Sequence, residues 1–279
     1  MLFSIFCVAG LLFTVIRNRY FSLKTKLIIH LIAFIAAMLV NYITASGLIS
    51  GFSQSEISQK YHTLITPAGF AFSIWGVIYG LLFLCLLFWL WKKNDIDQQP
   101  LLHQLSPWIW MMLAVNIAWN IVFSLSLIGA SLLFILMYWI ILLLICHKLK
   151  GNLNLFSISF GIHLGWITVA SIVNFFAFLV QLNGQDLQSS SALWYNIALL
   201  FGILMGFLLI FILKNGAVPL AMAWAYFGIY MKLNSIPDNT NLILKLNTLT
   251  GIIFLLGLSL GSFVGLKWRK LFGNKPNQS

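Results

Sequence analysis

Acidic side chains are scarce in this chain of 279 residues, which has five Asp and Glu in total. All of them fall in predicted loops, at Glu56, Asp95, Asp97, Asp186 and Asp238. Transporters driven by protons or sodium usually carry a carboxylate at mid-membrane, and triad hydrolases need an acid behind the histidine. The sequence shows neither arrangement, and it shows no nucleotide-binding loop. We therefore predict no catalytic residue.

Cysteine is also rare, and Cys7, Cys85 and Cys146 are each isolated in an apolar run. None of them has a second metal ligand at the spacing of a zinc site, and the three do not form the paired pattern of a disulfide framework. Each is expected to pack as a small buried side chain. We therefore predict no metal site.

Charged residues make up only 8% of the chain and hydrophobic residues 61%, a composition that excludes a soluble globular domain. The apolar runs are continuous and about twenty residues long, which predicts membrane-spanning helices rather than the alternating strands of a membrane barrel. The predicted fold class is an all-α integral membrane protein, a helical bundle in contact with the lipid bilayer. The apolar N-terminus lacks a basic region and a cleavage site, so it is interpreted as a retained first span.

The apolar runs predict nine spans, at residues 2–16, 27–50, 68–91, 107–128, 130–146, 155–180, 193–213, 217–231 and 242–266. With this count, all of the 16 basic residues except Lys60, Lys232 and Lys245 fall on one side of the membrane. The positive-inside rule makes that side cytoplasmic, with the N-terminus outside and the C-terminus inside a bacterial cytoplasmic membrane. The net charge of +11 is thus explained by topology, and binding of nucleic acid is not predicted.

Residues 66–80 join a polar loop to the third span. Thr66 is expected to cap a helix whose first turn contains Pro67. Phe72, Trp75 and Tyr79 would then lie on one aromatic face of this helix. Such a face can enclose a flat apolar ligand, or it can serve as an aromatic anchor at the membrane interface.

Two later spans carry polar residues, which are costly in lipid and are therefore expected to face the bundle interior. The fourth span has a stripe at i, i+3, i+4 and i+7, and the sixth has one at i, i+3, i+7 and i+11. We predict that these stripes and the aromatic face line one cavity for a planar apolar ligand; alternatively, the amides only join neighbouring helices. The two stripes consist of Asn116, Trp119, Asn120 and Phe123, and of His163, Trp166, Ala170 and Asn174.

His163 has two interpretations. An imidazole inside a porphyrin site can be the axial ligand of a haem iron. A single buried histidine is more often a hydrogen-bonded core residue, and nothing in the sequence places His30, on another span, opposite it.

Glycines recur at intervals of four on two spans, at Gly202 and Gly206 on the seventh, and at Gly257, Gly261 and Gly265 on the ninth. Small residues at this spacing let helices approach closely. We expect both sets to pack inside the bundle, and a homodimer interface is the alternative.

Three segments of the sequence resemble the TspO/translocator-protein family, the tryptophan-rich sensory proteins. Pro67–Tyr79 is similar to the family's element that leads from a Pro-rich loop into an aromatic helix. Asn116–Phe123 is similar to its Asn-x-x-Trp helix, and Trp166–Asn174 to its final Trp-x-x-x-Ala-x-x-x-Asn helix. The order of the three segments and the intervals between them also agree with the family.

The resemblance sets expectations for organisation and function. It implies a five-helix core at residues 27–181, an extra N-terminal helix within residues 1–26, and three extra helices within residues 182–279. It implies a membrane receptor for porphyrins or sterol-like molecules with a sensory, regulatory or transport role, and some members are reported to promote porphyrin breakdown. No cofactor is obligatory, and a porphyrin or haem would be a ligand.

Residue roles follow from the same resemblance. The walls of the site would be Trp75, Trp119 and Trp166, the lid Pro67 and Phe70, and the hydrogen-bonding groups Tyr79, Asn116, Asn120 and Asn174. The sequence departs from the family where Pro67-Ala-Gly-Phe70 replaces Pro-Pro-x-Trp, and where Ile162-His163 replaces Pro-Tyr. Two other functions stay open, namely transport of a small uncharged or amphipathic solute and enzymatic degradation of a bound porphyrin.

Overall fold

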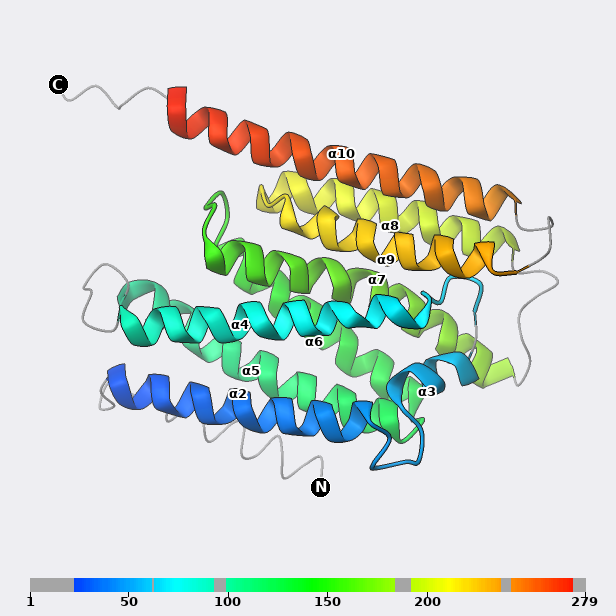
Figure 1. Ribbon diagram of the computed structural model, residues 1–279, viewed down its shortest axis with the longest axis horizontal. Helices are drawn as coiled ribbons and strands as arrows, with labels where there is room; N and C mark the ends of the chain where they lie inside the picture. Colours follow the sequence, from blue (N-terminus) through cyan, green and yellow to red (C-terminus); the bar gives the residue numbers. More distant parts are fainter. Residues whose placement is uncertain (1–22, 62, 93–98, 184–191, 237–241, 273–279) are drawn as a thin grey trace.

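The computed structural model describes residues 23–61, 63–92, 99–183, 192–236 and 242–272 (Figure 1). These residues form α-helices and one short 3₁₀-helix, η1, without any strand, so the predicted all-helical fold class is confirmed. The helices are α2 (Leu23–Ala45), α3 (Gln54–Lys60), η1 (Gly69–Ser73), α4 (Ile74–Trp91), α5 (Gln99–Ser124), α6 (Ile128–Lys148), α7 (Leu155–Asn183), α8 (Ala192–Leu213), α9 (Ala217–Asn234) and α10 (Leu242–Phe272).

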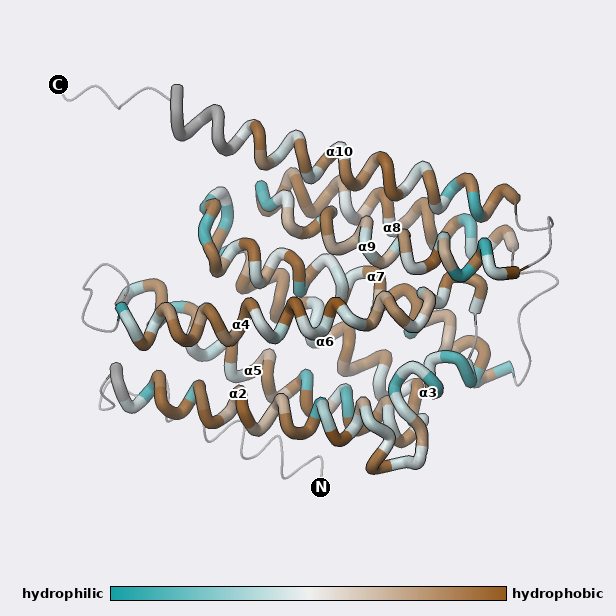
Figure 2. Tube along the Cα trace, in the orientation of Figure 1, coloured by the Kyte–Doolittle hydropathy of each residue, from teal (hydrophilic) through white to brown (hydrophobic). Residues whose placement is uncertain are grey.

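Seven helices in the described part of the chain are long and apolar enough to cross a membrane. They are α2, α5, α6, α7, α8, α10 and the continuous η1–α4 segment, and they match seven of the nine predicted spans. Hydrophobic positions run along these helices, whereas hydrophilic positions gather near their ends and on α3 (Figure 2). The first predicted span, residues 2–16, lies outside the described residues.

The eighth predicted span forms α9, which is not among the seven. It nevertheless runs alongside α8 and α10 for most of their length (Figure 1) and packs against α7. Most of its side chains are buried against protein, including Pro219 and Tyr226. Because α9 is shielded by neighbouring helices, it does not need the strongly apolar surface of a lipid-facing span.

Glycines permit the close approach of α9 to its neighbours. A Cβ atom at Gly165 on α7 would lie 2.2 Å from the carbonyl oxygen of Val218 on α9. At Gly202 on α8 it would lie 2.3 Å from the hydroxyl of Tyr226, which donates a hydrogen bond to the Leu199 carbonyl (2.5 Å). The expectation of internal packing is therefore confirmed for α8.

On α10 the same expectation is wrong for the described residues. An added Cβ at Gly257, Gly261 or Gly265 would meet no atom within 4 Å. The reason is that this stripe turns toward an open groove beside Phe211 and Phe254 instead of toward a neighbouring backbone. The expected homodimer stays a prediction.

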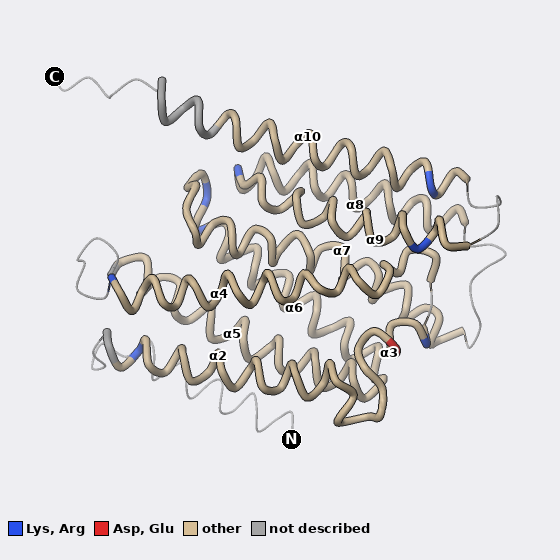
Figure 3. Tube along the Cα trace, in the orientation of Figure 1, with Lys and Arg blue, Asp and Glu red and all other residues tan. Residues whose placement is uncertain are grey.

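Basic residues lie at both ends of the described bundle, and few charges lie between them (Figure 3). Those at the start of α2, at the end of α4, α6 and α8, and in the turn between α6 and α7 belong to one end, because successive long helices run in opposite directions. This arrangement agrees with the grouping on which the predicted orientation depends, and the orientation itself stays a prediction.

Two predicted boundaries are wrong. The helix α5 begins at Gln99 and continues through Pro107, since neighbouring helices can compensate for the hydrogen bond that a proline removes from a membrane helix. Thr66 does not cap the next helix, because its hydroxyl accepts a hydrogen bond from the Thr63 N–H (3.2 Å) within the preceding turn. The chain enters η1 from Ala68, which has no side-chain cap.

Candidate functional site

Three tryptophans from three helices meet inside the bundle. The ring centre of Trp75 on α4 lies 6.1 Å from that of Trp119 on α5 and 6.3 Å from that of Trp166 on α7. Phe72 on η1 adds an edge-to-face contact with Trp166 at 5.8 Å. The predicted stripes therefore face one another, because each repeats at helical spacing along a helix that borders the same interior space.

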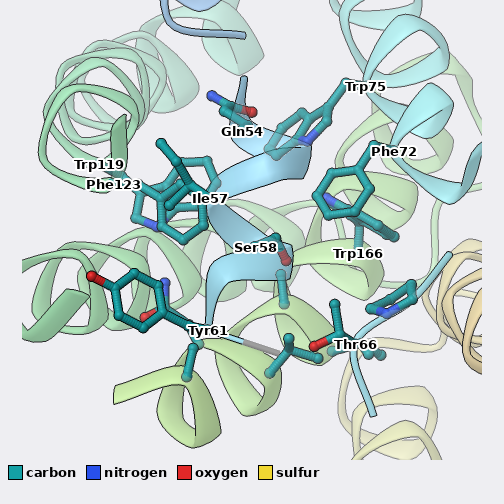
Figure 4. A pocket seen from close by; sticks show the side chains of 16 residues that line it. Gln54, Ile57, Ser58, Tyr61, Thr66, Phe72, Trp75, Trp119, Phe123 and Trp166 are labelled. Carbon is teal, nitrogen blue, oxygen red and sulfur yellow. The ribbon is translucent and has the colours of Figure 1, made fainter. Parts of the chain in front are cut away.

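These rings enclose a cavity, here called the chamber, with a free volume of about 50 Å³. Figure 4 shows α3 running across it, with Trp75, Phe72 and Trp166 on one side and Trp119 and Phe123 on the other. Of the predicted site residues, eight line the chamber: Pro67, Phe72, Trp75, Trp119, Phe123, Trp166, Ala170 and Asn174.

The part of the chamber that sequence reasoning missed is α3. Its residues Gln54, Ile57 and Ser58 are buried and line the chamber. The Gln54 amide donates hydrogen bonds to the carboxamide oxygen of Asn120 and to the hydroxyl of Thr44 (3.4 Å). These side chains occupy the space between the aromatic walls, which is why so little of it is free.

A capping box determines where α3 begins. The Ser53 hydroxyl accepts a hydrogen bond from the Glu56 backbone N–H, and the Glu56 carboxylate accepts one from the Ser53 backbone N–H (2.7 Å). Hydrogen bonding of the Glu56 carboxylate to the Ser53 backbone N–H, and secondarily to the Ser53 side chain, lowers the pKa of Glu56. The Ser-x-x-Glu pattern followed by Ile57 was the available sequence signal for a short helix with one buried face.

Three predicted polar residues lie beside the chamber rather than on its wall. Asn116 accepts a hydrogen bond from the Asn41 amide on α2 (3.0 Å), and its backbone carbonyl accepts one from the Asn120 amide (2.8 Å). The Asn116 side chain also lies near the hydroxyls of Tyr79 and Tyr138. The predicted residues Tyr79, Asn116 and Asn120 thus belong to a buried polar network that joins α2, α4, α5 and α6.

Two residues that line the chamber carry a hydrogen-bond donor without a partner among the described residues. One donor is the indole nitrogen of Trp119 and the other is the amide nitrogen of Asn174, and both are buried. The Asn174 carboxamide oxygen lies 3.1 Å from the Ser131 hydroxyl, which also donates to the Ile128 carbonyl (2.8 Å). Buried donors normally find an acceptor, so these two can serve a bound molecule.

His163 does not line the chamber. Its Nε2 shares a 2.5 Å hydrogen bond with the Tyr138 hydroxyl, and the ring of Trp75 covers it edge-on at 5.8 Å. The residue is fully buried, so a haem in the chamber would have no direct path from its iron to this imidazole. The site therefore does not fit axial ligation, and the described residues contain no cluster of three or more His, Cys, Asp or Glu that could hold a metal ion.

Phe70 points away from the chamber. Its ring contacts Trp224 at 5.7 Å and Phe227 at 5.8 Å, both on α9. The Trp224 indole N–H donates to the Ala71 carbonyl (2.9 Å), and the Ala68 N–H donates to the Gly228 carbonyl (3.0 Å). The loop that carries Pro67 and Phe72 is thus held by α9, a contribution that the sequence motifs did not indicate.

Comparison with known proteins agrees with the sequence segments that build the chamber. A family model described as TSPO-like protein matches residues 27–260. No curated protein matches the chain, and no solved structure matches it. The family match continues past residue 181 through α8 and α9 and into α10, whereas the division into a core at 27–181 and extra helices stays a prediction.

Proposed function

The chain belongs to the TSPO-like protein family, and on this basis we propose that its chamber binds planar apolar molecules, with porphyrins as the principal class. Family membership implies a TSPO-type ligand-binding membrane protein. The observation that carries the proposal is the meeting of Trp75, Trp119 and Trp166 around one interior space. Aromatic walls of this kind suit a flat ring system, because they offer large apolar faces at little cost in side-chain entropy.

The unpaired donors narrow the ligand class. Trp119 and Asn174 each present a buried N–H without a partner, which favours a ligand with acceptor oxygens at its edge. The propionate groups of a porphyrin are acceptors of this type. The aromatic walls would hold the ring, while the two donors would fix its orientation.

Ligand binding requires α3 to move. Sites for small molecules usually have volumes of about 300–1,000 Å³, whereas the chamber has about 50 Å³. Withdrawal of Gln54 and Ile57 would enlarge it without disturbing the tryptophans on the long helices. A ligand that binds only the open form shifts the population of α3 toward that form.

This coupling supports a sensory or regulatory role. The position of α3 would report whether the chamber is filled, and the neighbouring loop is in contact with α9 through Ala68 and Ala71. Filling of the chamber would in this way alter the contact between this loop and α9.

The direct test is titration of the purified protein in nanodiscs with protoporphyrin IX, followed by the shift of the porphyrin absorbance band. We expect saturable binding in the unmodified protein and at least about tenfold weaker binding in Trp166→Ala, because a buried aromatic wall is lost. The matched control is Trp91→Ala, since Trp91 is 78% exposed at the far end of α4. Equal affinities for both variants and the parent would contradict the proposal.

A further inference from the structure

A second cavity lies next to the chamber and has a volume of about 360 Å³. We call it the α2 cavity, because Met38, Asn41, Tyr42 and Ala45 of α2 form one wall. The opposite wall includes Trp75 and Tyr79, whose rings are stacked at 5.2 Å with an angle of 18° between their planes. Gln54, Phe72 and Trp75 border both cavities and separate them.

One residue in the wall of the α2 cavity carries a buried polar atom without a partner among the described residues. The Asn41 side chain is 7% exposed, and its amide nitrogen donates to Asn116 while its carboxamide oxygen accepts no hydrogen bond from a described residue. If both amides were turned over, Asn41 would instead present an unpaired N–H. A hydroxyl group satisfies either arrangement, because it can donate and accept.

The rim of the α2 cavity connects it to the outside of the bundle. Tyr42 is 68% exposed, and Ala45 is also exposed, so both lie on the outer surface at the end of α2. Since α2 is a membrane-spanning candidate, this rim lies near one membrane interface. An amphipathic molecule in the bilayer places its polar group at that depth and its apolar body further in.

We propose that the α2 cavity is a separate binding site for an apolar molecule that carries one hydroxyl group, such as a long-chain or polyene alcohol. The hydroxyl binds Asn41, and the apolar body lies against the stacked rings of Trp75 and Tyr79. The volume is within the usual range for small-molecule sites. This site does not depend on binding of a porphyrin in the chamber.

The test uses two probes with the same chromophore, all-trans-retinol and its 15-deoxy hydrocarbon, with energy transfer from tryptophan as the readout in nanodiscs. In the unmodified protein we expect retinol to bind about tenfold or more tightly than the hydrocarbon, because only retinol satisfies the buried amide. In Asn41→Leu this preference should disappear. The ratio of the affinities of one variant for the two ligands cancels general effects of the substitution on the protein.

Variants that fill one cavity locate the site. Ala45→Phe should weaken retinol binding, whereas Ala192→Phe, at the exposed start of α8, should leave it unchanged. Ala170→Phe, which fills the chamber, should reduce binding of protoporphyrin IX but not that of retinol. The proposal is overturned if the preference for retinol is absent, if it survives Asn41→Leu, or if Ala170→Phe abolishes retinol binding in place of Ala45→Phe.

Discussion

At the scale of single residues, replacement of glycine by alanine should have different effects at Gly165 and at Gly261. A methyl group at Gly165 would lie 2.2 Å from the Val218 carbonyl oxygen, so α7 and α9 would have to separate. A methyl group at Gly261 would meet no atom of the described residues within 4 Å. The local backbone is helical at both positions, and only the distance to the neighbouring helix differs.

We therefore predict that Gly165→Ala lowers the unfolding temperature in detergent micelles, since overpacking typically costs about 1–3 kcal/mol. Gly261→Ala should leave that temperature unchanged or raise it, because alanine is the better helix former by about 1 kcal/mol. A loss of stability in Gly261→Ala that depends on protein concentration would instead show that this stripe contacts a second copy of the chain.

At the scale of secondary-structure elements, α3 is the feature that decides whether the chamber is open. It has only seven residues, so it is too short to be stable in isolation, and its buried side chains hold it in place. Ile57 is 1% exposed and lies between the aromatic walls. Truncation of the Ile57 side chain should lower the stability of the closed form, in which this side chain is buried, more than that of the open form.

We predict that Ile57→Ala raises the affinity for protoporphyrin IX by several-fold. The binding-competent form is then a larger fraction of the molecules, and apparent affinity rises in proportion to that fraction. Hydrogen exchange of the α3 amides, which should be faster in this variant, measures the opening directly. Ile32→Ala, at a 61% exposed position of α2, is the control. Weaker binding in Ile57→Ala would mean that Ile57 touches the ligand rather than excluding it.

The elements also show what sequence patterns can reveal. The chamber walls were predictable, because Trp75, Trp119 and Trp166 each belong to a stripe at helical spacing, and two of the three stripes contain amides that lipid would not tolerate. The burial of α3 was not predictable, because its capping pattern marks only where a helix begins, and seven residues give no periodic signal long enough to indicate a buried face. Phe70 was placed in the lid by its motif, but its direction depends on Trp224, which lies on a helix far away in the sequence.

At the scale of the whole molecule, α9 connects the C-terminal helices to the chamber. It packs against α7, α8 and α10, and it contacts the loop before α4 through two hydrogen bonds. The family match covers α9 as well as the helices that carry the tryptophans. The C-terminal helices are therefore expected to influence ligand binding without lining the chamber.

We predict that Trp224→Phe, which removes the indole N–H from the Ala71 carbonyl, loosens the loop without unfolding the protein. The loss of one hydrogen bond costs about 1 kcal/mol, or roughly fivefold in the population of the ordered loop. Hydrogen exchange at residues 71–73 should accelerate. The affinity for protoporphyrin IX should also change, because Phe72 and Trp166 in the chamber wall would lose their fixed contact. Trp194→Phe, at a 59% exposed position on α8, controls for the loss of an indole. If both variants bind protoporphyrin IX as the parent does, α9 supports the fold but takes no part in ligand binding.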